Sequence, residues 1–255
     1  MNKKQRLLNE MVSIYVRDGE PIGSESLRLT MGIKISSSTI RNYFKIFVDE
    51  GILLQPHISS GRIPADDTLK DYWRKNINLL NIISISNIDK VQSASNKYGV
   101  FCNIKIVNNQ ILREVIDYNK QYIILLFSDD EVILKYTSHV FSFMTELIGQ
   151  SIDDIKSISR SVCANSIFYK LNSLSGSQVF NCGYEFLRNI DENVIVEILN
   201  GHIYYRLRNG FYFNLSPDGY LCLIQDVTLD NNYGKMLIFG KLRCNYTDFY
   251  HAIAS

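Results

Sequence analysis

The chain has 255 residues, of which 46% are hydrophobic and 21% are charged, and its formal net charge at pH 7 is +1. This composition is typical of a globular protein with one to three domains, and it excludes a disordered, fibrous or strongly polycationic chain. The charge is uneven, since residues 1–80 hold twelve Lys and Arg against nine Asp and Glu. A mildly basic first segment fits phosphate contact at one end of the molecule.

Three short helices are predicted in the first fifty residues. Apolar residues at three- and four-residue spacing predict a helix over 4–17, which ends before Gly19. Ser24 is a suitable N-cap for a second helix that runs to about Met31. A run of three serines supplies the cap of a third helix, which ends near Glu50.

A small β-hairpin is predicted after the third helix. A strand at 52–54 leads into a turn at 59–61, and the chain returns at 62–63. Three short helices followed by a hairpin are the pattern of a winged helix-turn-helix. A further helix over 66–80 contains the single tryptophan and closes this predicted DNA-binding domain, residues 1–80.

The remainder of the chain is predicted to be a mixed α+β domain with a helical segment in its middle. Its expected strands are 100–107, 111–117, 121–127, 132–140, 178–182, 202–208, 211–214, 220–228 and 235–240. Its expected helical segments are 143–172 and the region near 190–199. The fold class is therefore α+β.

Cysteine and histidine spacing gives no sign of a metal site. The five cysteines are odd in number and form no Cys-x-x-Cys pair, and the four histidines lie far apart. We expect reduced, mostly buried thiols and neither metal nor cofactor. The longest apolar run, 122–127, is too short to span a membrane, and the N-terminus lacks the features of a signal peptide. A cytoplasmic protein is expected.

The exposed face of the third helix is predicted to read DNA. Its core-facing residues are Ile40, Phe44, Phe47 and Val48, whereas Ser38, Arg41, Asn42, Lys45 and Asp49 share the other face. Arginine bonds guanine O6 and N7 bidentately, and asparagine bonds adenine N6 and N7 in the same way. The helix start offers hydroxyl groups to phosphate oxygens, from Ser36, Ser37 and Thr39.

The tip of the predicted hairpin adds polar and basic side chains, namely His57, Ser59, Ser60 and Arg62. A basic tip of this kind reaches the DNA backbone or the minor groove. Pro56 and Pro64 bracket the tip and stiffen it. Any one of these features is also what an ordinary solvated surface shows, but the helix, the hairpin and the basic segment together predict DNA binding.

The same residues resemble those of the HrcA family of heat-inducible transcription repressors. The likeness runs through Gly19-Glu20-Pro21-Ile22-Gly23-Ser24, Ser36-Ser37-Ser38-Thr39-Ile40-Arg41-Asn42, Glu50-Gly51-Ile52-Leu53-Leu54-Gln55-Pro56-His57, Ser59 and Gly61-Arg62-Ile63-Pro64. A weaker likeness to the family's GPTRMDY motif lies at Gly240-Lys241-Leu242-Arg243-Cys244-Asn245-Tyr246, where only the Gly, the Arg and the Tyr are kept. The middle of the chain is short for the family, and only nine residues follow Tyr246.

The resemblance implies a winged-helix head, a GAF-like body and a small dimerising segment inserted in that body. On this reading the body comprises 81–149 and 196–255, and the insert comprises 150–195. The resemblance further implies a homodimer that binds an inverted-repeat DNA operator, represses chaperone operons and depends on the GroE chaperonin for activity.

Three alternatives to a chaperone-operon repressor can be weighed from the residues. A GAF-like body that binds a small effector would make the chain a ligand-responsive regulator, although fold does not imply function. An enzyme is not expected, because the sequence has no nucleophile elbow, phosphate-binding loop or dinucleotide-binding glycine motif. A redox switch at Cys102 or Cys244 is less favoured than burial, because neither has a charged neighbourhood that would lower its pKa.

Overall fold

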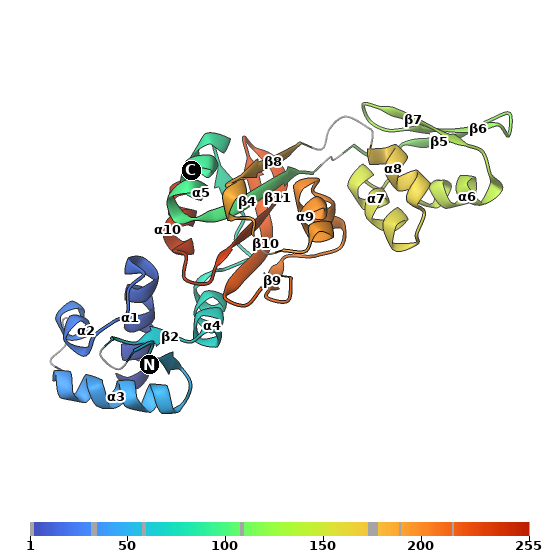
Figure 1. Ribbon diagram of the computed structural model, residues 1–255. Helices are drawn as coiled ribbons and strands as arrows, with labels where there is room; N and C mark the ends of the chain where they lie inside the picture. Colours follow the sequence, from blue (N-terminus) through green and yellow to red (C-terminus); the bar gives the residue numbers. More distant parts are fainter. Residues whose placement is uncertain are drawn as a thin grey trace.

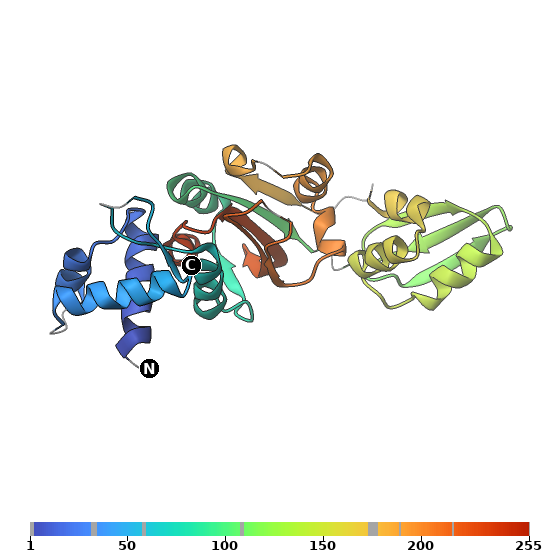
Figure 2. The same cartoon turned by 60° about the horizontal axis from the view of Figure 1, so that its bottom comes forward.

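The computed structural model describes residues 3–31, 35–57, 60–107, 110–172, 178–188, 190–215 and 217–254. It is an α+β structure whose three units follow one another along an elongated molecule (Figures 1 and 2). The head comprises residues 3–76 and the distal unit 110–172. The central unit lies between them and is formed by 83–106 and 179–253.

The head consists of three helices, a two-stranded hairpin and a fourth helix: α1 (Lys3–Asp18), α2 (Ser24–Thr30), α3 (Ser37–Asp49), β1 (Leu53–Leu54), β2 (Ile63–Pro64) and α4 (Asp66–Asn76). These are the elements that the apolar spacing predicted, although α4 ends four residues before the expected position. Each helix turns its apolar stripe inward, and Leu7, Leu27, Ile40 and Trp73 are fully buried in one continuous core.

The hairpin is anchored to the segment that precedes α2. Ile22 and Arg62 exchange two backbone hydrogen bonds, both 2.9 Å long. A Cβ atom on Gly61, the residue before Arg62, would lie 2.6 Å from the Ile22 backbone. Position 61 therefore accommodates only glycine. The second strand of the hairpin is therefore joined to the segment before α2.

The central unit is built on a sheet of six strands: β3 (Ile83–Ile85), β4 (Val100–Ile106), β8 (Val179–Cys182), β9 (Gly210–Tyr212), β10 (Tyr220–Leu229) and β11 (Asn232–Lys241). The order across the sheet is β3-β10-β11-β4-β8, and β9 also pairs with β10. Only β3 runs parallel to its neighbour. The register of β10 and β11 places Tyr220 opposite Lys241 and Leu229 opposite Asn232.

Helices cover both faces of this sheet. One face packs against α5 (Ile88–Tyr98) and α10 (Tyr246–Ile253), and this apolar cluster continues into the head. The other face packs against η1 (Tyr184–Phe186), α9 (Glu192–Leu199) and η2 (His202–Tyr205). Because successive side chains of a strand point to opposite faces, the uninterrupted apolar stretch of β10 serves both cores.

The strand expected at 202–208 is wrong. His202–Tyr205 form the 3₁₀ helix η2, which follows Gly201 in a left-handed conformation with φ +65°, and 206–208 form no strand. Tyr204 is buried against the sheet, and its hydroxyl donates hydrogen bonds to the backbone and side-chain oxygens of Asn103 at 2.9 and 2.6 Å. A short apolar run occurs both in strands and in buried helical turns. The spacing of its apolar residues therefore does not show which of the two structures it forms.

The distal unit has its own sheet and its own core. Its elements are β5 (Glu114–Tyr118), β6 (Tyr122–Leu126), β7 (Glu131–Lys135), α6 (Ser138–Glu146), α7 (Ile152–Ser161) and α8 (Asn165–Asn172). The antiparallel order β5-β6-β7 joins no strand of the central sheet. The helices lie on one side of the three strands (Figure 1), and Leu125, Met144 and Ile155 are buried between the layers.

The sheets divide the chain differently from the predicted boundaries. The strands within 111–135 were expected in the first part of the body, 81–149, but they pair only among themselves. The central sheet is interrupted between β4 and β8, so the inserted segment is bounded by residues 107 and 178 instead of 150 and 195. A strand pattern shows that a segment is extended and leaves its partner undefined, which is why the sequence misplaced this boundary.

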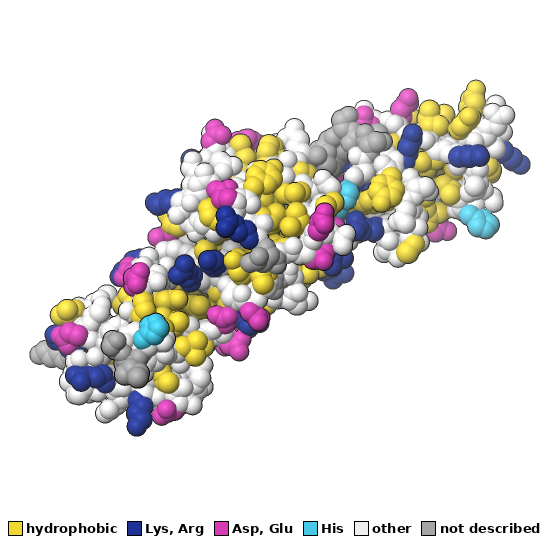
Figure 3. Space-filling model, in the orientation of Figure 1, with side chains coloured by type: hydrophobic (Ala, Val, Ile, Leu, Met, Phe, Trp, Pro, Cys, Tyr) yellow, Lys and Arg dark blue, Asp and Glu magenta, His cyan; other side chains and the backbone are white. Residues whose placement is uncertain are grey.

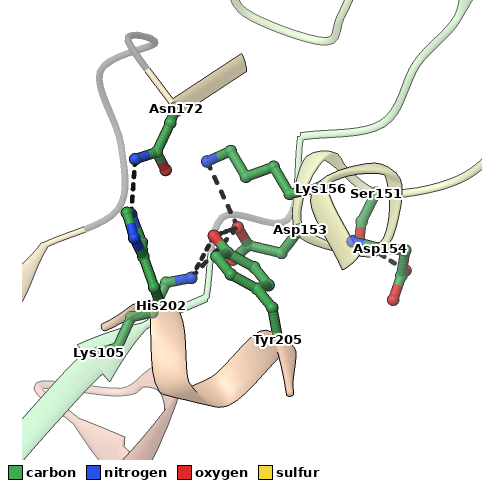
Figure 4. Close-up of polar contacts among 8 residues, drawn as sticks. All are labelled: Lys105, Ser151, Asp153, Asp154, Lys156, Asn172, His202 and Tyr205. Atoms are coloured by element: carbon green, nitrogen blue, oxygen red, sulfur yellow. Dashed lines mark hydrogen bonds and ion pairs between the residues drawn. The ribbon is translucent and has the colours of Figure 1, made fainter. Parts of the chain in front are cut away.

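A buried cluster of charges joins the distal unit to the central unit. Asp153 on α7 lies 3.5 Å from the ammonium groups of Lys105 and of Lys156. Tyr205 on η2 donates a hydrogen bond of 2.9 Å to Asp153 and accepts one from Lys105. Figure 4 shows these four side chains converging from β4, α7 and η2. The contact between the distal unit and the central unit, called the distal joint below, thus depends on one carboxylate that lies between two lysines.

Burial changes the proton affinities in this cluster. It lowers the pKa of Lys105 to about 8, because loss of hydration disfavours the ammonium form more than Asp153 stabilises it. The pKa of Lys156 is lowered for the same reason, and that of Tyr205 is raised by burial and by Asp153. Two lysines with lowered pKa values indicate that the single carboxylate incompletely offsets the cost of burying both.

Candidate nucleic-acid interface

The start of α3 is fixed by a network of hydroxyl groups. Ser36 is the N-cap, and its side chain accepts the Thr39 backbone N–H at 3.1 Å. The same oxygen lies 2.8 Å from the hydroxyls of Ser38 and Thr39. Ser37 lies 3.2 Å from the Ser24 hydroxyl on α2. The Ser36 network therefore fixes the first turn of α3, and the contact between Ser37 and Ser24 joins α3 to α2.

The outward face of α3 presents the predicted readout residues. Ile40, Phe44 and Phe47 are buried and Val48 is half-buried, as their spacing predicted. The side chains of Arg41, Asn42 and Lys45 are exposed on the outward side. Within the described part of the head, none of these three forms a hydrogen bond or a close ion pair. Their donors are therefore open to a ligand.

Most other cations of the head are neutralised by nearby carboxylates. Five ion pairs are formed, by Lys4 with Glu50, Arg17 with Asp18, Arg28 with Glu25, Lys70 with Asp67 and Arg74 with Asp71. Arg41 and Lys45 on α3 form no such pair, although the pKa of Glu25 is lowered mainly by Arg28 and to a lesser extent by Arg41. Figure 3 shows Lys and Arg side chains projecting from the end of the head that carries this helix. Lys3, Arg6 and Lys75 also form no ion pair among the described residues, so the head keeps positive charge on α3 and elsewhere.

The hairpin tip is ordered by one serine. The Ser60 hydroxyl donates to the His57 carbonyl oxygen at 2.7 Å and accepts the His57 backbone N–H at 3.0 Å. The His57 side chain is exposed, and Ser60 is half-buried. Ser59, which was also predicted to contact DNA, lies outside the described residues. The Ser60 hydroxyl thus fixes the backbone of His57, whose imidazole lies at the surface of the head.

Arg62 is turned back onto its own loop. Its Nη1 atom donates to the carbonyl oxygens of Ser60 and Gly61 at 3.1 and 3.4 Å. The side chain is half-buried, and its Nε has no partner among the described residues. The guanidinium therefore braces the hairpin tip, a role that its charge alone does not reveal in the sequence.

The described residues contain neither a cluster of metal ligands nor a membrane-spanning helix. In that part of the chain no group of three or more His, Cys, Asp and Glu side chains is placed to hold a metal ion. Across the same ranges, every helix is too short or too polar to cross a lipid bilayer.

Comparison with known sequences identifies relatives over the whole chain. A family model described as the HrcA C-terminal domain matches residues 73–255. A heat-inducible transcription repressor HrcA of Helicobacter pylori strain 26695 is 33% identical over 257 residues, which cover 100% of this chain and 95% of that protein. Its counterpart from strain J99 is 31% identical with the same coverage. Because both are matched over nearly their full length, the short middle of this chain is a feature that they share.

Comparison with solved structures supports the fold. A crystal structure of a hypothetical protein superposes with a TM-score of 0.53 at 17% identity, over 99% of this chain and 94% of the other. At that identity the likeness concerns the fold alone. The family model covers most of the chain, and the two full-length relatives are more than 30% identical to it. The chain therefore belongs to the HrcA family of heat-inducible transcription repressors.

Proposed function

We propose that this protein represses heat-shock (chaperone) operons by binding an inverted-repeat DNA operator as a homodimer in the cytoplasm. The observation that carries the proposal is the exposed face of α3, where Arg41, Asn42 and Lys45 form no hydrogen bond or close ion pair among the described residues. An unpaired arginine next to an asparagine at the start of a helix is suited to base edges in the major groove. The full-length relatives are named as repressors, which supports the same function.

Arg41 and Asn42 are assigned to base readout. The phosphate contacts are assigned to Ser36, Ser37, Ser38, Thr39, Lys45, His57, Ser59 and Ser60, on α3 and on the hairpin tip. Arg62 is assigned mainly to bracing the tip, because its Nη1 is already bonded to two carbonyl oxygens of the loop. Its Nε is buried, so a secondary phosphate contact would have to come from its Nη2 group.

The architecture supports this assignment. The order of three helices and an anchored hairpin fits a winged helix-turn-helix, in which α3 enters the major groove and the hairpin tip lies beside it. The central sheet, with helices on both faces, is consistent with a GAF-like body. The distal unit is the candidate for the dimerising insert, because it interrupts that sheet and folds around a separate core.

A row of isoleucines on the distal sheet is our candidate for the dimer contact. Ile116, Ile124 and Ile133 lie side by side across β5, β6 and β7. Ile133 is 50% exposed, although it is a large apolar side chain in the middle of a strand. The helices of the unit pack on the other face, and Ile116 and Ile124 are half-buried beside Ile133. A two-fold contact places the same row of each copy against the other.

Replacing Ile133 by Glu is expected to convert the dimer into a monomer. In a two-fold interface the substitution occurs in both copies, so two carboxylates would be buried facing each other without a counter-charge. The free-energy cost of burying the charge is therefore incurred twice. Light scattering after size exclusion measures the mass. The control is Val162→Glu, at an exposed apolar residue beyond the end of α7. Monomeric wild-type protein, or an Ile133→Glu variant that stays dimeric, contradicts this interface.

Arg41→Ala is expected to reduce the preference for operator over unrelated DNA by ten- to a hundredfold, because a bidentate base contact contributes about 1–3 kcal/mol to discrimination. Lys45→Ala should weaken binding to both duplexes alike and reduce the salt slope by about one. Lys70→Ala is the control, because that lysine is paired with Asp67 on α4. Fluorescence anisotropy at several salt concentrations, on an operator enriched from random duplexes, separates these results. Unchanged selectivity of Arg41→Ala argues against the readout role.

Dependence on the GroE chaperonin is proposed from the family resemblance. Typical domains are stable by only about 5–15 kcal/mol, so modest warming can empty the DNA-binding state. A chaperonin that refolds the repressor would then set its active fraction. Gel shifts with heat-treated protein, with and without GroE and ATP, test this step. DNA binding that recovers equally without GroE contradicts it.

A further inference from the structure

A basic cleft lies between the end of α1 and the central unit, on a surface that the proposed function does not use. Its volume is about 700 Å³. One wall is the end of α1, residues 16–19, and the other is formed by 96–99, Glu185, Phe186, Arg188, Tyr220, Gly240, Lys241 and 243–245. Figure 3 shows Lys and Arg side chains gathered where the head meets the central unit.

The cleft carries a clear excess of positive charge. Lys97, Arg188, Lys241 and Arg243 all line it, whereas Glu185 is the single acid on the central-unit wall. Arg17 and Asp18 on the opposite wall pair with each other at 2.7 Å. Among the described residues, none of the four central-unit cations forms an ion pair. Four like charges around one cavity repel each other, and a bound anion would relieve that repulsion.

The C-terminal motif 240–246 builds this wall, and packing explains only some of its residues. A Cβ on Gly240 would lie 2.9 Å from the Tyr246 hydroxyl, so glycine is needed for this close approach. The Leu242 carbonyl accepts the Trp73 indole N–H at 2.7 Å, and the Lys241 carbonyl accepts the Tyr246 hydroxyl at 2.9 Å. The backbone is therefore fixed from inside.

The two basic side chains of the same motif do not contribute to this internal packing. Lys241 and Arg243 are exposed, and neither has a hydrogen-bond or ion-pair partner among the described residues. They flank the buried Leu242, so the fixed backbone presents both to the cleft. Arg188 is also held in place, because its Nε donates to the Glu185 carbonyl oxygen at 2.7 Å. Its terminal nitrogens remain available. The wall is thus a rigid support for three cationic groups.

Aromatic rings complete the lining. Tyr98, Phe186 and Tyr220 are half-buried on the same wall, and Tyr220 is stacked on Phe239 with 5.2 Å between ring centroids. The cleft volume lies in the range that binds small molecules, about 300–1,000 Å³. Cations for phosphates beside aromatic faces for a planar ring are the chemistry that recognises a nucleotide. We propose that this cleft binds a phosphate-bearing small molecule of nucleotide size.

The site is separate from the DNA-binding face of α3. Lys4 in the first turn of α1 pairs with Glu50 at the end of α3, whereas the cleft lies at the other end of α1. The intervening helix spans about 20 Å at 1.5 Å per residue. A ligand in the cleft contacts both the head and the central unit. Ligand binding is therefore coupled to the position of the head relative to the central unit.

The test is isothermal titration calorimetry of the full chain with pyrophosphate and with ADP, at physiological ionic strength and without added metal. Both probes are expected to bind once per chain, ADP more tightly because its base can stack on the aromatic wall. Lys241→Gln/Arg243→Gln should weaken both at least tenfold. The matched control, Arg113→Gln/Lys120→Gln, removes the same charges from the distal unit and should bind like wild type. ADP should also raise the melting temperature of wild-type protein and leave that of the cleft variant unchanged.

Two results would overturn the proposal. The first is binding of neither probe at millimolar concentration, or equal binding by the cleft variant and the wild type. The second is a tenfold loss of affinity of the ligand-free cleft variant for unrelated duplex DNA, which would assign these cations to the DNA backbone. Calorimetry with the small probes does not involve the operator, so a failure of the repressor assignment leaves this test intact.

Discussion

Replacing Trp73 by Ala is expected to lower the free energy of unfolding by about 3–5 kcal/mol. Trp73 is fully buried at the point where α4 of the head meets the central unit. Its indole N–H donates to the Leu242 carbonyl oxygen at 2.7 Å, and its ring packs edge-to-face on Tyr246 with 5.0 Å between centroids. The substitution removes a large apolar volume and leaves a buried carbonyl without its donor.

Urea denaturation followed by circular dichroism measures this change. Trp73→Phe keeps most of the apolar contact and loses the hydrogen bond, so we expect a smaller loss of about 1–3 kcal/mol. Arg74→Ala, at the exposed neighbouring position, should change stability by less than about 1 kcal/mol. If Trp73→Ala and Arg74→Ala were equally mild, Trp73 would not be the main link between the two units.

Replacing Asp153 by Asn is expected to lower the free energy of unfolding by a similar amount, about 3–5 kcal/mol. The side chain of Asp153 is 12% exposed, and those of Lys105 and Lys156 are 5% and 1% exposed. Removing the carboxylate leaves two ammonium groups buried close together without a counter-charge. The first consequence should be loss of contact between the distal unit and the central unit, because the cluster spans that joint.

Lys156→Met tests the same cluster with the opposite expected sign. Lys156 has no hydrogen-bond partner for its Nζ among the described residues, so replacing it by an apolar side chain should be neutral or stabilising. In Asp153→Asn/Lys156→Met, one of the two uncompensated charges is gone, and part of the lost stability should return. Such non-additivity is the signature of groups in direct contact. Strictly additive effects of the two substitutions would show that these charges do not interact.

The two joints of the molecule are therefore of different chemical kinds. The head is attached through an aromatic side chain in a core that continues into the central unit. The distal unit contributes a second, separate core and meets the central unit through buried charges. Desolvation of charged groups becomes less costly as temperature rises, so heating should affect the two joints unequally.

The sequence by itself determined the local structure of the head and the family. Helices α1 to α3 follow from apolar spacing and serine caps, which act within a few residues of each other. The exposure of Arg41, Asn42 and Lys45 followed from the helical spacing of the apolar residues, because Ile40, Phe44 and Phe47 define the buried side of α3. The motifs around the hairpin were dense enough to identify the family that the full-length relatives then established.

The tertiary structure alone decided which distant segments meet. The separate sheet of β5, β6 and β7, the charges around Asp153 and the cationic wall of the cleft all join residues remote from one another in the chain. The bracing role of Arg62 likewise depends on a loop conformation that includes Gly61. Local propensity carries no information about strand partners or about which charges share a buried space, because both are set by long-range packing.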